Sequence, residues 1–264
     1  MARTTMHSHP GTPTVAAAPT ELLETGHLWI LEWVDGAHLR FQVRESGALR
    51  FGDRERVFPA DDAPLPYRHA IRHVRSSLDR AALRDALADV ESVTFFGVAT
   101  QKGSIEYDWG RLPSFLGCDV WVGDRDAFLP PDATEQVFER LGLDPLNAVA
   151  REVRARDFDP DAYELPTSHW YDGPAAGVLL RNKSGGRARL PNPALENPEP
   201  APVDAPVADV VDEFAPRRRF EATAQRLAQR GEAVTVDAVR DRVLEGVYRE
   251  HHRRLCHGGS DVDP

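Results

Sequence analysis

The chain has 264 residues, a formal net charge of −10 and 28% charged residues. That length can hold one large domain with a sizeable core and a smaller second one. The acidic excess excludes nonspecific nucleic-acid binding through bulk charge, so any RNA contact must use local basic patches.

The cysteine count and the lengths of the apolar runs indicate the cellular compartment. Cys118 and Cys256 are too few for a disulfide framework and indicate a reducing, cytoplasmic location. No apolar run approaches the roughly 20 residues of a membrane span, and no signal pattern opens the chain, so no membrane partner is expected. Lys102 and Lys183 are the only lysines. An acidic, arginine-rich chain suits a halophilic cytoplasm, and equally a GC-rich genome.

The N-terminal half begins with small, polar and proline-containing residues over 1–20, which predict disorder. Residues 28–41 then predict a strand, a tight turn at Asp35-Gly36 and a second strand. Leu39 and Phe41 alternate with polar neighbours after the turn, as in a half-buried strand. Taken alone, Asp35-Gly36 is typical of a hairpin turn.

Later elements follow from apolar periodicity and turn residues. Strands are predicted over 49–54, 93–99, 104–109 and 115–122, and helices over 68–90, 134–141 and 147–156. A hairpin is predicted from 177–181 and 187–190. Six prolines make 191–206 a linker, after which the pattern turns helical. The expected organisation is a main domain over 21–190, a helical C-terminal domain over 207–256 and a tail over 257–264.

The first strand and turn contain Glu32-Trp33-Val34-Asp35-Gly36. This run resembles the first motif of the covalent nucleotidyltransferases, Glu-Lys-x-Asp-Gly. In that family the lysine attacks the nucleotide α-phosphate. The frame of the motif fits, and the position of the nucleophile holds Trp33.

The order of the other blocks is more specific than any one motif. From about His27 to Leu255 the chain is similar to the archaeal, haloarchaeal-type branch of the ATP-dependent RNA ligases. The matching blocks are Gly26-His27-Leu28-Trp29, Arg50-Phe51-Gly52-Asp53-Arg54, Phe95-Phe96-Gly97, Tyr107-Asp108-Trp109, Phe115-Leu116-Gly117-Cys118-Asp119-Val120, Trp170-Tyr171-Asp172-Gly173-Pro174, Gly177-Val178-Leu179-Leu180-Arg181 and Tyr248-Arg249-Glu250. The resemblance implies an α+β fold: a ligase-type nucleotidyltransferase domain of antiparallel sheets with flanking helices around an ATP cleft.

Four positions that carry chemistry in that family are changed here. The nucleophile is Trp33, the ribose-binding glutamate is Val98, the metal-binding glutamate is Ala176 and the α-phosphate lysine is Arg189. No catalytic or metal-ligating residue is therefore assigned. The family implies ATP and Mg²⁺ as cofactors, and these substitutions argue against both.

The periphery of a nucleotide site is retained. By resemblance, the candidate nucleotide-binding residues are Glu32, Asp35, Gly36, Arg40, Arg54, Phe115, Arg181, Arg187 and Arg189. For each arginine the alternative is a solvated strand face, and for Phe115 it is a place in the core.

Three functional hypotheses follow. The first is a pseudo-ligase that has lost self-adenylation and binds a nucleotide or an RNA end. The second is an active RNA ligase or nucleotidyltransferase using a pre-adenylated end or an unusual nucleophile. The third is a structural partner of itself, as a homodimer, or of an active ligase. Arg217-Arg218-Arg219 and Arg253-Arg254 are candidate RNA contacts, or alternatively a partner-facing patch.

Overall fold

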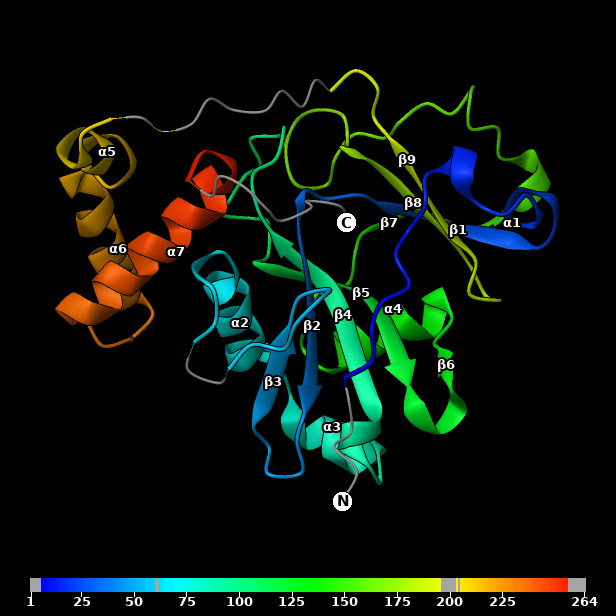
Figure 1. The fold of residues 1–264 in the computed structure, drawn as a ribbon, viewed down its shortest axis with the longest axis horizontal. Coiled ribbons are helices and arrows are strands. Elements are labelled where there is room, and N and C mark those ends of the chain that lie inside the picture. The colour runs from blue at the N-terminus through cyan, green and yellow to red at the C-terminus, as the bar shows by residue number, and fades with distance from the viewer. Residues whose placement is uncertain (1–5, 60–61, 196–202, 204, 256–264) are drawn as a thin grey trace.

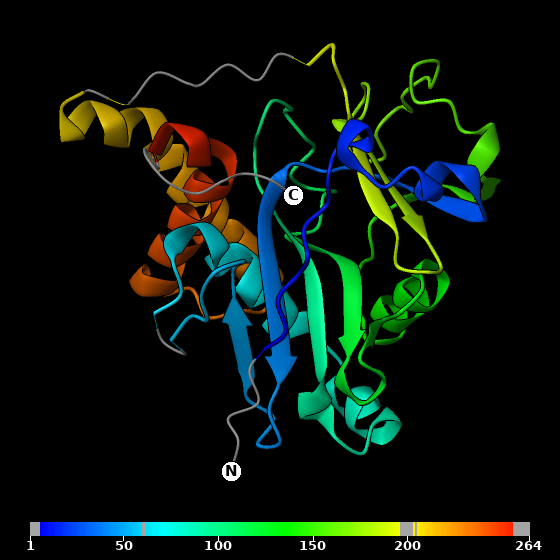
Figure 2. The same cartoon turned by 45° about the vertical axis from the view of Figure 1, so that its right-hand side comes forward.

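The computed structural model describes residues 6–59, 62–195, 203 and 205–255. Two antiparallel sheets form its main body, as the resemblance implies (Figure 1). The five-stranded sheet has the strand order β3-β2-β4-β5-β6 and the four-stranded sheet the order β7-β1-β8-β9. The blue N-terminal stretch runs between them, across the face of the five-stranded sheet (Figures 1 and 2).

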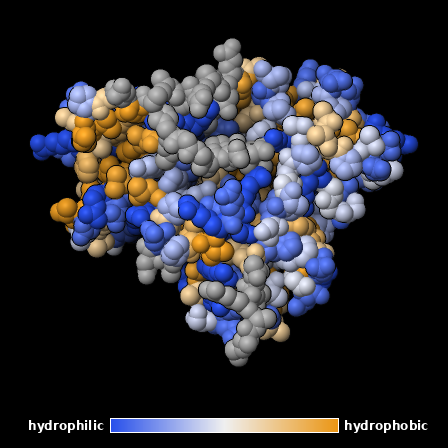
Figure 3. All heavy atoms as spheres, in the orientation of Figure 1, coloured by the Kyte–Doolittle hydropathy of each residue, from blue (hydrophilic) through white to orange (hydrophobic). Residues whose placement is uncertain are grey.

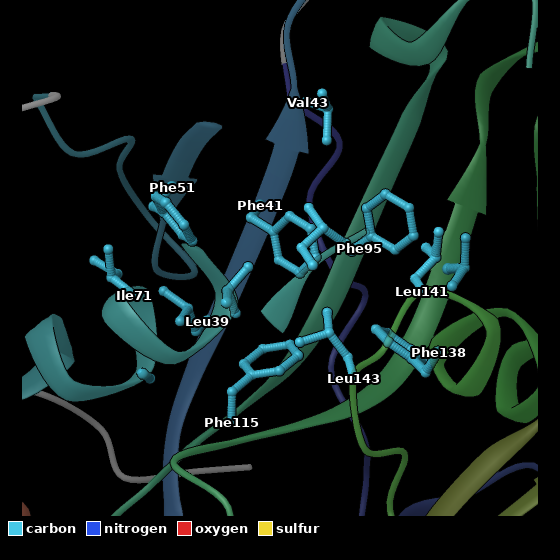
Figure 4. Close-up of a cluster of buried hydrophobic side chains, with 14 of the residues drawn as sticks. Leu39, Phe41, Val43, Phe51, Ile71, Phe95, Phe115, Phe138, Leu141 and Leu143 are labelled. Carbon is cyan, nitrogen blue, oxygen red and sulfur yellow. The ribbon is translucent and has the colours of Figure 1, made fainter. Parts of the chain in front are cut away.

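The five-stranded sheet carries the main core. Its strands are β2 (Gly36–Val43), β3 (Leu49–Gly52), β4 (Val93–Thr100), β5 (Phe115–Val122) and β6 (Ala127–Phe128). Helices α2 (Leu65–Ser77), α3 (Arg80–Ala86) and α4 (Pro131–Arg140) contribute to the same core. Phe41 stacks on Phe95 with ring centroids 4.8 Å apart, and both rings are fully buried (Figure 4). Burying such rings is the largest single contribution to core stability.

The four-stranded sheet contains β1 (His27–Glu32), β7 (Ala148–Arg154), β8 (Gly177–Asn182) and β9 (Arg187–Pro191). The predicted hairpin is confirmed, because β8 pairs with β9 from Gly177 opposite Pro191 to Arg181 opposite Arg187. Helix α1 (Glu21–Glu24) supplies Leu22 to a second core against this sheet. Short 3₁₀ turns at Val15–Ala17, Val90–Ser92, Gly123–Arg125 and Ala155–Asp157 complete the connections.

Beyond the linker lie α5 (Val207–Phe214), α6 (Arg217–Gln229) and α7 (Val236–Leu255). Helix α7 packs on both α2 and α6. Most of the predicted linker and tail lies outside the described residues. Among the described residues, no helix has the length and apolarity needed to cross a bilayer.

The predicted Asp35-Gly36 hairpin is wrong. Strand β1 pairs with β7 and β8, while β2 pairs with β3 and β4, so the two strands belong to different sheets. Residues 33–35 therefore connect the two sheets. Each strand of the expected hairpin finds longer partners elsewhere in the chain, and those pairings override the local turn signal.

Three other element predictions need correction. The helix predicted over 147–156 is β7, because the edge of β1 offers hydrogen-bond partners that local helical spacing cannot report. The strand predicted over 104–109 is irregular, since Asp35 and Trp170 bind its backbone amides. The helix predicted over 68–90 is divided at Asp79, whose carboxylate caps α3 through the amides of Ala81 and Ala82.

Candidate functional site

The motif residue Glu32 ends β1 and is buried. Its carboxylate accepts hydrogen bonds from Ser168 Oγ at 2.5 Å, from Asn147 Nδ2 at 3.1 Å and from the His169 amide at 3.1 Å. A buried carboxylate needs such partners, because leaving one unpaired is costly. Glu32 therefore fastens the 168–169 loop to the four-stranded sheet, and its oxygens are already engaged.

Asp35 organises a second loop. Its Oδ2 accepts the Ser104 amide at 3.0 Å, and the Asp35 amide donates to Tyr107 Oη at 3.1 Å. Burial raises the pKa of Asp35, and the amides of the 103–105 loop partly oppose that rise. Gly36 is required for close packing, because a Cβ there would lie 2.3 Å from the Ala99 carbonyl oxygen. Both motif residues thus hold the junction between the sheets.

Trp33 is the residue that the sequence resemblance predicts to replace a nucleophilic lysine. Its indole lies against Gly177, where an added Cβ would come within 2.8 Å of Trp33 Cε3. The guanidinium of Arg189 lies over the ring at 5.5 Å from its centroid, a cation–π contact. Val98 and Ala176 are both buried, at 6% and 9% exposure. The three changed positions are therefore packed, and they offer no amine or carboxylate.

Residues 6–14, here named the N-terminal segment, run along the face of the five-stranded sheet opposite the main core (Figures 1 and 2). Arg40 Nη1 donates to the carbonyls of Met6 at 3.3 Å and His7 at 2.8 Å, and to Ser8 Oγ at 3.0 Å. The ring of His7 stacks on Trp121 at 3.6 Å. At the other end, the Arg189 amide donates to the Pro13 carbonyl at 2.8 Å.

The disorder predicted over residues 1–20 stays a prediction: residues 1–5 lie outside the described residues, and residues 6–14 lie along the sheet. The position of the N-terminal segment explains why β2 is buried on both faces. His38 and Arg40 point away from the main core, yet they are only 8% and 4% exposed. The N-terminal segment and its neighbours cover them. The half-buried strand expected from the alternation is therefore fully buried in the structure.

The space between the two sheets, beneath the N-terminal segment, is here named the cleft. At its centre is a group here named the cleft cluster, consisting of His9, Asp119, Arg181 and Arg187. Asp119 Oδ2 lies 2.9 Å from His9 Nε2 and pairs with Arg187 at 3.1 Å, and the other oxygen of Asp119 pairs with Arg181. Burial raises the pKa of Asp119, but Arg181, the His9 hydrogen bond and Arg187 outweigh burial and lower it to about 2. Two guanidinium groups that could meet a phosphate thus share one buried carboxylate, which offsets one of their two positive charges.

Little space is left beside the cleft cluster. A cavity of about 30 Å³ remains between the sheets, lined by His9, His38, Val98 and Asp119 among others. That volume holds one or two water molecules. Neither ring nitrogen of His38 has a hydrogen-bond partner among the described residues, and burial lowers its pKa well below the usual value. The space that remains is too small for a nucleotide.

The remaining predicted binding residues lie in two places. Arg54 is half-buried beside the N-terminal segment, with Nη1 3.8 Å from the position of a Cβ on Gly11. Phe115 is fully buried in the main core, next to Phe41 and Phe138 (Figure 4). The core alternative for Phe115 therefore agrees with its position. Arg54 joins Arg40, Arg181, Arg187 and Arg189 around the cleft.

The residues present do not suit ATP with a divalent metal. Among the described residues, the one group with metal-ligating spacing is His9, Cys118 and Asp119, whose donor atoms lie within 4.8 Å of one another. Burial raises the pKa of the Cys118 thiol to about 12, so it carries a proton at neutral pH. Asp119 already faces two arginines, whose charges oppose a bound cation. No step through a metal is therefore derived.

His9 and Asp119 were not singled out from the sequence as site residues. The contact between them spans 110 residues, and nothing in the polar N-terminus marks its partner. A signal did exist at Asp119, a single carboxylate within the apolar strand Phe115–Val122. A charge at such a position requires a buried partner.

Comparisons with known proteins identify solved structures with a similar fold. Neither a protein-family model nor a curated protein matches the chain. The solved structures that match include the RNA ligase of Naegleria gruberi. A variant bound to ATP and Mn superposes with a TM-score of 0.56 at 12% identity, over 72% of this chain and 57% of that one. The same ligase with PPi gives a TM-score of 0.55 at 13% identity, over 72% and 57%.

The likeness defines a class. The chain has the RNA-ligase-type nucleotidyltransferase fold of antiparallel sheets and flanking helices. Among its structural neighbours is the ligase of Naegleria gruberi, and the chain spans little over half the length of that protein. At such low identity the comparison establishes the fold alone.

Proposed function

We propose that the chain is a noncatalytic RNA-ligase-like protein, a pseudo-ligase that binds a nucleotide or an RNA end without becoming adenylated. The observation that carries this proposal is Trp33, an indole packed on Gly177 where the fold class has its nucleophilic amine. Removing the nucleophile of a covalent enzyme costs on the order of 10⁶ in rate. The missing carboxylates at Val98 and Ala176 add to that loss.

No other lysine replaces the nucleophile. Lys183 pairs with Glu152 at 2.8 Å and with Asp132 at 3.0 Å, and these hydrogen bonds raise its pKa. Lys102 pairs with Glu106 in the loop that follows β4. An amine whose pKa is raised by carboxylates, as that of Lys183 is, is a poor nucleophile. Both lysines therefore serve as ion-pair partners in this proposal.

The N-terminal segment controls access to the proposed binding site. Arg187 contacts His9 Nε2 at 2.7 Å, and Arg40 binds three groups of the same segment. When the segment leaves, Arg40 loses these three contacts and can meet a phosphate, and Arg187 keeps only its pairing with Asp119 among its ion pairs. Arginine suits this role because its planar fork can bind two phosphate oxygens at once.

Two measurements on the full chain test the proposal. Incubation with labelled ATP and Mg²⁺ or Mn²⁺, followed by a denaturing gel, should show no covalent adduct. Calorimetric titration with AMP should give at least about tenfold tighter binding once residues 1–12 are removed. In the full chain AMP must first displace the hydrogen bonds between the segment and the arginines, and each of these contributes about 1 kcal/mol or more. Thr14 and the Pro13–Arg189 hydrogen bond are retained in that truncation.

His9→Ala is the companion variant, since it removes one contact of Arg187, whose ion pair with Asp119 remains, without deleting the segment. It should tighten AMP binding in the same direction by a smaller factor. An adduct on Lys102 or Lys183 would establish the enzyme hypothesis instead. Failure of AMP to bind any of the three proteins would remove nucleotide binding from the proposal.

A structural-partner role is supported by a separate observation. The exposed large apolar side chains among the described residues belong to the C-terminal part: Val207, Val211, Val234 and Val236. Figure 3 shows apolar atoms gathered over the region of α5. Exposed apolar groups of this kind are typical of association surfaces. Sedimentation of Val207→Ser with Val211→Ser against wild type tests whether they join two copies of the chain.

A further inference from the structure

A second open space lies outside the cleft. This space, here named the helical cavity, is enclosed by α2, the 109–114 loop, α6 and α7, and it measures about 540 Å³. Small-ligand sites typically measure about 300–1,000 Å³. No residue of the cleft cluster lines it. The helical cavity is therefore large enough for a nucleotide and separate from the cleft.

Its lining is strongly basic, although the whole chain is acidic. Seven arginines and three glutamates line the helical cavity. The glutamates are already used: Glu245 pairs with Arg72 at 2.7 Å, Glu250 pairs with Arg219 at 2.6 Å, and Glu232 lies 3.4 Å from Arg242. The other four arginines form no ion pair with a described carboxylate, and so they leave a local excess of positive charge.

Arg249 shows this excess most clearly. It is 9% exposed, and its hydrogen bonds to described residues all go to uncharged oxygens: Thr100 Oγ1 at 2.7 Å and the carbonyls of Thr100, Leu112 and Pro113. Burial lowers its pKa to about 10, which still leaves it charged at neutral pH. The charge of Glu250 opposes that fall in pKa, but no described carboxylate forms an ion pair with Arg249, so its burial remains costly.

Other groups in the lining suit a nucleotide. His69 is 2% exposed, and neither of its ring nitrogens makes a well-formed hydrogen bond with a described residue. His73 Nε2 also lacks a partner there. Trp109 lies beside Arg249, with the guanidinium 4.9 Å from the ring centroid. The ring nitrogens are shielded from solvent, so the group that can reach a base next to the positive charge is the aromatic side chain of Trp109.

We propose that the helical cavity binds a terminal phosphate, with Arg226 and Arg230 contacting the phosphate oxygens and the buried charge of Arg249 adding to the positive potential around them. The phosphate comes from a free nucleotide or from the 5′ end of an RNA strand, which present the same chemistry. A carboxylate ligand fits less well, because the arginines surround a volume that a phosphate with its nucleoside can fill. The site is independent of the cleft and does not require adenylation.

Helix α6 offers a matched pair of variants. Arg226 and Arg230 line the helical cavity, whereas Arg217 and Arg218 lie on the same helix outside the lining. All four side chains are exposed, so neither double substitution should disturb folding. Arg226→Ala with Arg230→Ala and Arg217→Ala with Arg218→Ala each remove two positive charges. Only the first pair removes them from the helical cavity.

Isothermal titration of the full chain at low salt would use pyrophosphate, AMP, and a tetraribonucleotide with a 5′-phosphate or a 5′-hydroxyl. For pyrophosphate, the Arg226/Arg230 variant should lose at least about tenfold in affinity, and the Arg217/Arg218 variant less than about twofold. Tighter binding of 5′-phosphorylated RNA than of AMP would identify an RNA end as the ligand. The reverse order would identify a free nucleotide.

Two results would overturn the proposal. Equal losses in both variants would show that only the overall charge matters. Unchanged affinity in the Arg226/Arg230 variant, or no heat change for wild type at low salt, would show that the helical cavity binds no phosphate. Neither result depends on removing the N-terminal segment, so the proposed function of the cleft is tested separately.

Discussion

The cleft and the helical cavity both gather arginines, and they differ in what lies opposite those arginines. In the cleft, Asp119 meets Arg181 and Arg187, the N-terminal segment covers them, and about 30 Å³ remains. In the helical cavity, four of the seven arginines form no ion pair with a described carboxylate, and about 540 Å³ remains. The comparison shows that an arginine on a strand of the sheets can become structural when a buried carboxylate pairs with it, while arginines on the helices remain available to a ligand.

The largest expected effect comes from removing the carboxylate that distinguishes the cleft. Asp119→Ala leaves Arg181 and Arg187 buried without an opposite charge, which should lower the free energy of unfolding by about 3–5 kcal/mol. The matched change in the helical cavity is Glu245→Ala. It should cost about 1 kcal/mol, since its partners Arg72 and Arg242 have side chains 34% and 26% exposed and water screens them.

Urea unfolding of both variants and wild type, followed by circular dichroism, measures these two values. Glu245→Ala should also tighten pyrophosphate binding, because it increases the positive excess of the helical cavity. A cost for Glu245→Ala as large as that for Asp119→Ala would contradict the comparison. The two arginine groups would then be equally structural.

A second, smaller effect concerns pH. The pKa of Asp119 is about 2 in the folded chain and about 3.9 in an unfolded one. Because the folded pKa is lower, the ionised carboxylate stabilises the fold above pH about 4, and this contribution is lost as the pH falls toward 2. The stability difference between wild type and Asp119→Asn should therefore narrow by about 2 kcal/mol between pH 6 and pH 2.

Chemical unfolding of both proteins at a series of pH values gives that difference directly. A difference that stays constant down to pH 2 would show that Asp119 does not carry the charge that neutralises the arginines. The cleft and the helical cavity would then be electrostatically alike.

The smallest expected effect is that of placing a lysine at position 33, which should not produce self-adenylation. Trp33→Lys places an amine at the family's nucleophile position, beneath Arg189. No labelled adduct with ATP and Mg²⁺ should form, because Val98 and Ala176 provide no carboxylate and the N-terminal segment still fills the cleft. A gel assay on Trp33→Lys, with and without residues 1–12, checks this. An adduct in the full-length variant would mean that the cleft is open and that only the nucleophile was lost.

Some features could be predicted from the sequence, because they depend on neighbouring residues or on the order of motifs along the chain. The β8–β9 hairpin has two apolar runs joined by a glycine-containing turn, and it was predicted correctly. The paired antiparallel sheets followed from the order of motif blocks. In contrast, β7 was predicted as a helix, since Val149 and Val153 share helical spacing and the open edge of β1 is not visible in the sequence.

The sequence by itself determined which chemical groups exist: an indole and no amine at position 33, no carboxylate at Val98 or Ala176, and arginines in place of lysines. These are facts of composition, and no folding can supply a missing nucleophile. Only the tertiary structure decided which arginines pair with a buried carboxylate. His9 reaches Asp119 across 110 residues, and α7 brings Arg249 onto the 109–114 loop. Such contacts depend on sheet pairing and helix packing, which join segments whose local patterns carry no record of one another.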